Sequence, residues 1–135
     1  MREHAVIAVV AAVIEHEGLI LACRRRPEKA AGGKWEFPGG KVERRESEEE
    51  ALIREIREEL DVEIVTCARL RTDDTSVGSQ TIRLSCFLAK LLGELPTLSI
   101  DHDELRWLGA EDLAQLDWAA PDVPMVEQIV KRGLN

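Results

Sequence analysis

The feature that most constrains the fold is a run of ten consecutive apolar residues at positions 5–14. A membrane-spanning helix needs about 20 such residues, so this run is too short to be an anchor. Acidic residues follow it directly and no small-residue cleavage pattern appears, which argues against a secretory signal. We therefore expect a buried strand, a polar turn at 15–18 and a second strand at 19–24. The protein should be cytoplasmic, with no membrane partner.

The remaining sequence predicts helices interleaved with strands. Ser47 and Glu50 fit a capping box, so a helix should begin there and run to about residue 60. Further strands are expected at 62–71, 81–92 and 105–108, with a polar loop at 73–79, a short helix at 111–116 and a last helix at 123–132 that stops at Gly133. This order indicates an α/β fold with a mixed β-sheet covered by helices, and the length suits one domain, 1–135.

The charges of the chain are unevenly distributed. A formal net charge of −8 argues against a nucleic acid polymer as partner, because that binding draws most of its strength from neutralised phosphates. Many carboxylates fall between positions 43 and 63, and a basic stretch precedes them at 24–41. An acidic cluster beside a basic one can bind a polyanion only if cations come with it, which favours a metal site.

Three carboxylates share one flank of the predicted central helix. At 100° per residue, Glu55, Glu58 and Glu59 lie within about 100° of arc, next to the apolar stripe that faces the core. One interpretation is a solvated charged face relieved by ion pairs with Arg54 and Arg57. The other is a divalent-metal site, since Mg²⁺ binds through a few carboxylates together with substrate phosphates. Helical periodicity alone does not decide between these two interpretations.

A wider pattern favours the metal site. From Gly40 the sequence reads glycine, five residues, Glu46, seven residues, Arg54-Glu55-Ile56, one residue, Glu58-Glu59, one residue, Asp61-Val62. This resembles the Nudix box, GX5EX7REUXEEXGU, in which U is an aliphatic residue. The one departure is Asp61 at the late glycine, where aspartate should adopt the same left-handed turn at slight cost. The preceding stretch at 35–41 is similar to the MutT-like and CTP-pyrophosphohydrolase-like branches, so the resemblance implies a Nudix α/β/α sandwich.

The resemblance also implies a site for Mg²⁺, with Mn²⁺ as a possible substitute. The metal ligands would be Glu55, Glu58, Glu59 and the backbone carbonyl of Gly39. Glu46 and Arg54 would support them, Arg54 by orienting the carboxylates. The base that activates water varies in the family, so Glu55 and a later acidic residue both remain open. Asp101 is the first choice for that later residue and Glu104 the second, while the alternative is a plain polar loop.

The reaction implied is attack of water on a nucleoside triphosphate, giving a nucleoside monophosphate and pyrophosphate. The substrate would be an oxidised purine nucleotide such as 8-oxo-dGTP, cleared to sanitise the nucleotide pool, or CTP or dCTP. Arg25, Lys41 and Asp122 are the candidate substrate contacts. Arg25 could instead be a solvated loop arginine, and Asp122 could be an N-cap for the last helix.

Other branches of the family fit the sequence less well. Dinucleoside-polyphosphate hydrolases carry a tyrosine beyond the box, and this chain has none. Hydrolases of ADP-ribose usually have a proline about fifteen residues after the box, where Val77-Gly78 stands here. An inactive ligand-sensing module and an acidic structural domain are the remaining alternatives. The oligomeric state, monomer or homodimer, does not follow from the sequence.

Overall fold

The computed structural model describes residues 5–134 and begins with the two predicted strands. β1 (Ala5–His16) and β2 (Leu19–Arg25) form an antiparallel pair joined by a turn in which Glu17 and Gly18 have positive φ. The middle of β1 is buried without interruption, as expected for a strand that is covered on both faces. Among the described residues, none of the helices has the length and apolar character that crossing a membrane requires.

The strands form one mixed sheet with the main order β3-β2-β1-β6-β5. β1 pairs in parallel with β6 (Gln80–Leu91) and antiparallel with β2, which confirms the predicted mixed sheet. β5 (Ile64–Val77) lies at one edge beside β6, and β3 (Trp35–Glu36) lies at the other edge beside β2. Two strands pair off this path, β4 (Gly39–Lys41) with β1 and β7 (His102–Leu108) with β2.

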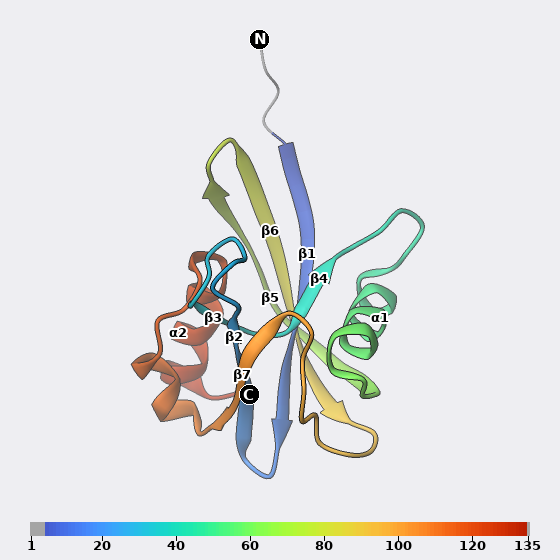
Figure 1. Cartoon of the computed structure of the whole chain (residues 1–135), viewed down its shortest axis with the longest axis vertical. Helices are drawn as coiled ribbons and strands as arrows, with labels where there is room; N and C mark the ends of the chain where they lie inside the picture. The colour runs from blue at the N-terminus through green and yellow to red at the C-terminus, as the bar shows by residue number, and fades with distance from the viewer. Residues whose placement is uncertain (1–4, 135) are drawn as a thin grey trace.

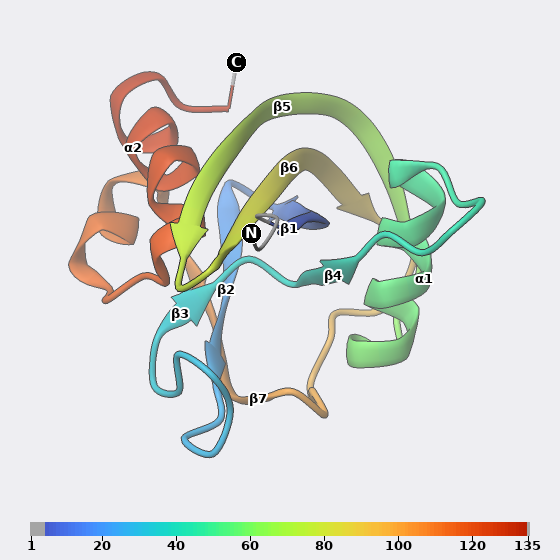
Figure 2. The ribbon, with the colours of Figure 1, turned by 90° about the horizontal axis from the view of Figure 1, so that it is seen from above.

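Helices cover the sheet from opposite sides (Figure 1). α1 (Glu48–Leu60) lies on one side and α2 (Val123–Arg132) on the other, and Figure 2 shows the sheet between them from above. Alternate residues of β1 enter two separate cores, because successive side chains of a strand point to opposite faces. Val10 and Ile14 pack on the side of α1, whereas Ala11 and Val13 pack on the side of α2. The expected α/β/α sandwich is confirmed.

Local signals position the ends of α1. Ser47 accepts from the backbone of Glu50, and the Glu50 carboxylate accepts from the backbone N–H of Ser47, so the predicted capping box is present. The helix ends at Asp61, which has φ 54 in the left-handed region. Aspartate therefore adopts the conformation expected of the glycine that the Nudix box has at this position. The helix has about the predicted length and includes Glu55, Glu58 and Glu59.

Several predicted boundaries were wrong. The polar loop expected at 73–79 is mostly strand, because β5 continues to Val77 and the turn is confined to residues 78–79. Its polar side chains have partners on β6, such as Asp74, which accepts two hydrogen bonds from Arg83. β7 begins at His102 rather than at residue 105, because residues 102–104 pair with the end of β2. The short helix expected at 111–116 is a 3-10 helix, Ala110–Gln115.

Candidate active site

Two adjacent glycines bring the backbone of β4 against β1 and α1. A Cβ atom on Gly39 would overlap the carbonyl oxygen of Val10 in β1. A Cβ atom on Gly40 would overlap the carboxylate of Glu55 in α1. Gly39 therefore cannot gain a side chain unless backbone moves, whereas at Gly40 only the Glu55 side chain is in the way. Both glycines lie at the junction of β4 with β1 and α1.

Arg54 organises the acidic side chains around this junction. Its Nε and Nη2 donate to both oxygens of Glu46, at 2.6 and 3.0 Å, and Nη2 also donates to the backbone oxygen of Lys41 at 3.0 Å. Its Nη1 donates to Glu55 at 2.9 Å and to Glu58 at 3.3 Å. The hydrogen bond from Arg54 holds the pKa of Glu46 below its usual value. One guanidinium therefore orients three carboxylates and the end of β4.

A cavity of about 340 Å³ opens beside this network. Six of the residues singled out from the sequence line it, namely Gly39, Glu55, Glu59, Asp101, Arg25 and Lys41. Lys29 is a further cation on its wall. The cavity therefore combines carboxylates with basic side chains, and that combination suits a polyanion that binds together with a metal ion.

Glu59 is the most unusual group of this cavity. The residue is only 5% exposed, and within residues 5–134 its Oε2 atom has no hydrogen-bond partner. Burial, with the nearby carboxylates of Asp101, Glu36 and Glu55, raises the pKa of Glu59 to about 9. A buried carboxylate without a partner is unfavourable, and a cation would remove that penalty. Oxygen atoms of Glu59, Glu55 and Gly39 are the donors that Mg²⁺ and Mn²⁺ prefer, so the residues present fit the implied metal.

The acidic side chains of the site do not form a complete set of metal ligands in the part of the chain that the structure describes. Across residues 5–134, no three histidine, cysteine or acidic side chains are placed so that together they could hold a metal ion. Arg54 binds the carboxylates of Glu55 and Glu58 in this arrangement.

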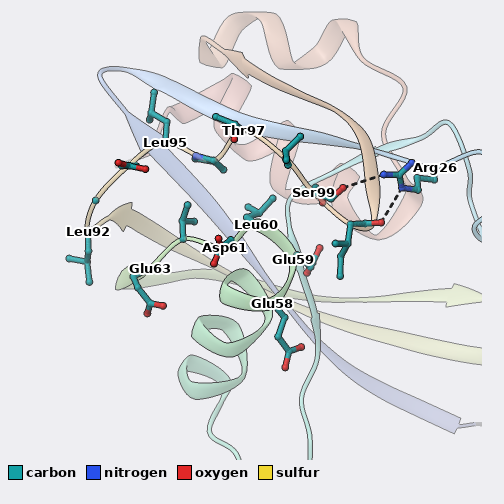
Figure 3. A pocket seen from close by; sticks show the side chains of 16 residues that line it. Arg26, Glu58, Glu59, Leu60, Asp61, Glu63, Leu92, Leu95, Thr97 and Ser99 are labelled. Atoms are coloured by element: carbon teal, nitrogen blue, oxygen red, sulfur yellow. Dashed lines mark hydrogen bonds between the residues drawn. The ribbon is translucent and has the colours of Figure 1, made fainter.

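Glu58 lies outside the small cavity. Its side chain is 57% exposed, and it lines a larger cavity of about 940 Å³ between the end of α1 and residues 92–100. Figure 3 shows Glu58 and Glu59 pointing apart, with Glu59 on the side of Ser99. Of the three predicted carboxylate ligands, the structure thus brings Glu55 and Glu59 to the small cavity and Glu58 and Glu59 to the larger one, and Arg54 donates to both Glu55 and Glu58.

The segment before β7 carries the loop carboxylate into the small cavity. Arg26 holds this segment, because its guanidinium donates to the backbone oxygens of Ile100 and Ser99 at 3.0 and 3.4 Å (Figure 3). The Asp101 carboxylate then lies 2.9 Å from Lys29 Nζ on the cavity wall. Glu104, the other loop candidate, pairs with Arg24 and Arg106 on β2 and β7 and does not line the small cavity.

The two remaining substrate-contact candidates both bind residues 36 and 37, just before β4. Arg25 is a half-buried side chain rather than a solvated one, and its Nη1 donates to Glu36 at 3.0 and 3.2 Å. Asp122 is buried, and its carboxylate accepts from the backbone N–H of Phe37 at 2.9 Å. Burial, followed by the charge of Glu36, raises the pKa of Asp122 well above its usual value.

Asp122 is the N-cap residue of α2, the position that the alternative interpretation gives it. Its side chain makes no capping hydrogen bond there, however, and accepts from the backbone N–H of Phe37 instead. Asp122 is absent from the lining of the small cavity. It therefore lies behind the turn, on the side of the core formed with α2.

Two polar residues of this region were not singled out from the sequence. Glu36 lines the small cavity, and His102 is a buried residue whose Nε2 lies 2.8 Å from Glu36 Oε2. Glu36 ends the short strand β3 and stands between Trp35 and Phe37, and His102 follows directly on Asp101. Neither position has a local sequence signal of a functional role.

Comparison with known proteins identifies the class. The sequence matches the NUDIX domain over residues 4–129, so the chain belongs to the Nudix hydrolase family. It is 37% identical over 122 residues to the CTP pyrophosphohydrolase of Escherichia coli (strain K12), covering 90% of this chain and 89% of that protein. An 8-oxo-dGTP diphosphatase of Proteus vulgaris is 41% identical over 75 residues, covering 55% of this chain and 65% of that protein. The NMR structure of a Staphylococcus aureus MutT is 39% identical, with a TM-score of 0.76 over 97% of this chain and 100% of that chain.

Proposed function

We propose that this Nudix hydrolase is a Mg²⁺-dependent nucleoside triphosphate pyrophosphohydrolase that releases a nucleoside monophosphate and pyrophosphate. The observation that carries the proposal is the buried Glu59 carboxylate, whose Oε2 lacks a partner within residues 5–134, in a cavity shared with Glu55 and the Gly39 turn. Mn²⁺ can replace Mg²⁺, because the donors are hard oxygen atoms.

The residues of the site have separate roles in this reaction. Glu55, Glu59 and the Gly39 carbonyl would hold the metal together with Glu58, and Arg54 with Glu46 would orient these carboxylates. When bound, the metal neutralises phosphate oxygens and lowers the pKa of a coordinated water. Arg25 and Lys41 bind phosphate oxygens from the facing wall. The water proton passes to Asp101 or Glu55, both of which lie in the cavity.

Asp122 and the relatives support a nucleotide with a cytosine or a guanine-type base as the substrate. A carboxyl group can accept from the exocyclic amine of cytosine or from N1–H and N2–H of a guanine-type edge. Asp122 is held by the N–H of Phe37, two residues before Gly39, so its carboxyl group lies close to the strand that borders the cavity. The names of the relatives, CTP pyrophosphohydrolase and 8-oxo-dGTP diphosphatase, agree with these two base types.

A substrate screen tests the proposal. We would compare kcat/KM for 8-oxo-dGTP, dGTP, CTP, dCTP and 5-methyl-dCTP with Mg²⁺ and with Mn²⁺, and identify the products by ³¹P NMR. Glu58→Gln and Glu59→Gln should each lower kcat/KM at least about 100-fold, because a metal ligand is lost. Glu49→Gln, an exposed acid on the first turn of the same helix, is the matched control. Unchanged Mg²⁺-dependent turnover in the Glu58 variant would overturn the assignment of that ligand, and no turnover of any nucleotide would favour the sensing module.

A further inference from the structure

His102 is a buried polar residue at the back of the cavity. Its side chain has no exposed surface, and the residue is paired across the strands with Arg25, at an irregularity in the register of β2 and β7. Its Nε2 lies 2.8 Å from Glu36 Oε2, and its Nδ1 lies 2.7 Å from Ser99 Oγ. Both ring nitrogens of this imidazole therefore have hydrogen-bond partners from two different segments, and Nδ1 also lies 3.9 Å from Glu59 Oε1 on α1.

The first partner connects His102 to a phosphate-binding side chain. Glu36 accepts from Arg25 Nη1 with both carboxylate oxygens, at 3.0 and 3.2 Å. Arg25 Nε donates to the backbone oxygen of Ala30 at 2.6 Å. A carboxylate only accepts, so His102 donates its Nε2–H to Glu36 and holds the oxygen that Arg25 also uses. The imidazole thus fixes Glu36, and Glu36 fixes the guanidinium of Arg25 at the cavity wall.

The second partner connects His102 to the loop carboxylate. Ser99 Oγ accepts from the backbone N–H of Asp101 at 3.3 Å while it shares a hydrogen bond with His102 Nδ1. The same short segment is attached to α1, because the N–H of Ile100 donates to the backbone oxygen of Glu59 at 3.3 Å. Removing the imidazole would leave Ser99, and with it the turn before Asp101, without its buried anchor.

We infer that His102 is a positioning residue that sets the distance between Arg25 and Asp101 across the cavity. The inference rests on the proposed function, in which Arg25 binds the phosphate chain and Asp101 is a candidate base. His102 does not line the cavity and touches no substrate. Its Nε2 side acts on substrate binding through Glu36, and its Nδ1 side acts on the chemical step through Ser99.

Two substitutions separate these two sides of the ring. In His102→Gln the amide nitrogen takes about the place of Nε2 and keeps the hydrogen bond to Glu36, and in His102→Asn the amide takes about the place of Nδ1 and keeps Ser99. We expect His102→Gln to lower kcat about 10-fold with little change in KM, and His102→Asn to raise KM about 10-fold with a smaller change in kcat. A purely structural role would give equal changes in both variants.

A milder variant keeps the test decisive if substitution of His102 prevents folding. Ser99 is only partly buried, and Ser99→Ala should lower kcat about 10-fold at unchanged KM. Thr97→Ala, an exposed hydroxyl of the same segment, is its control and should behave as the wild type. If Ser99→Ala and Thr97→Ala have the same kinetics, the inference for the Asp101 side is wrong.

NMR separates failure of this inference from failure of the proposed function. The Nε–Hε signal of Arg25 reports the rigidity of its side chain whether or not a nucleotide is hydrolysed. We expect a rigid Arg25 in the wild type and in His102→Gln, and a mobile one in His102→Asn. Equal rigidity in all three proteins would overturn the inference. A wild type that hydrolyses no nucleotide but shows this NMR difference would refute the proposed function alone.

Discussion

Gly39→Ala should destabilise the fold, whereas Gly40→Ala should leave the protein folded and lower its activity. Neither residue has a positive φ, so an added Cβ atom acts through contact and not through backbone strain. At Gly39 the obstacle is backbone of β1, including Ala11 Cα and Val10 C at 2.8 Å. At Gly40 the obstacle is the end of one flexible side chain, with Glu55 Oε1 at 2.8 Å.

These contacts give the expected magnitudes. Backbone cannot move away from Gly39→Ala without opening the pairing of β1 with β4, so the free energy of unfolding should fall by about 3 kcal/mol, the upper part of the usual range for overpacking. Glu55 can rotate away from Gly40→Ala at a cost of about 1 kcal/mol. A carboxylate displaced by about 1 Å costs on the order of 100-fold in turnover. Gly40→Ala should therefore remain folded and lose activity.

Urea unfolding, Mg²⁺ titration calorimetry and kcat measurements on both variants test this contrast. For Gly40→Ala we expect a melting temperature close to that of the wild type and a Mg²⁺ affinity reduced about 10- to 100-fold, as when a residue that orients a metal ligand is lost. The loss of kcat should be comparable. Full Mg²⁺ affinity in Gly40→Ala, or wild-type stability in Gly39→Ala, would refute the reasoning.

Three further predictions concern the same region. Burial raises the pKa of Asp122, so the folded state binds this proton more tightly than the unfolded chain. As the pH rises above about 4, the free energy of unfolding of the wild type should therefore fall relative to that of Asp122→Asn, by up to about 1.4 kcal/mol per pH unit. Urea unfolding between pH 4 and 8 measures this difference. Arg54→Lys should weaken Mg²⁺ binding about 10-fold by calorimetry, because an ammonium cannot bridge Glu46 and Glu55 as the guanidinium does. Mg²⁺ at about 100 times its Kd should stabilise the wild type by about 2.7 kcal/mol in thermal unfolding. Without metal, Glu59→Gln should be more stable than the wild type, and Mg²⁺ should not stabilise this variant further.

Local signals explain which parts of the fold could be predicted. The buried run of β1 and the capping box of α1 depend on neighbours in sequence, and the structure has both where they were expected. The second half of β5 depends on partners about ten residues away, such as the pair Asp74 and Arg83. Its polar residues therefore resembled a loop, because the cross-strand partners are not visible in a local pattern.

The candidate site divides in the same way. Box spacing brought together Glu46, Arg54 and Glu55 because one helix and the turn before it determine their arrangement. Glu36 and His102 meet only because β7 pairs with the end of β2 while β3 pairs with its other side. That arrangement follows from the sheet topology, which cannot be read from local sequence patterns. The ligand, base and substrate roles of the site residues remain predictions.

Anomalous diffraction from crystals grown with Mn²⁺ and a non-hydrolysable analogue of CTP tests the central claim most directly. We expect an anomalous peak within coordination distance of Glu55, Glu59 and the Gly39 carbonyl. Phosphate oxygens should lie on the other side of the peak, facing Arg25 and Lys41. Glu59→Gln crystals grown in the same way should lose that peak. A peak at another place on the molecule, with the Glu59 carboxylate still unpartnered, would contradict the account.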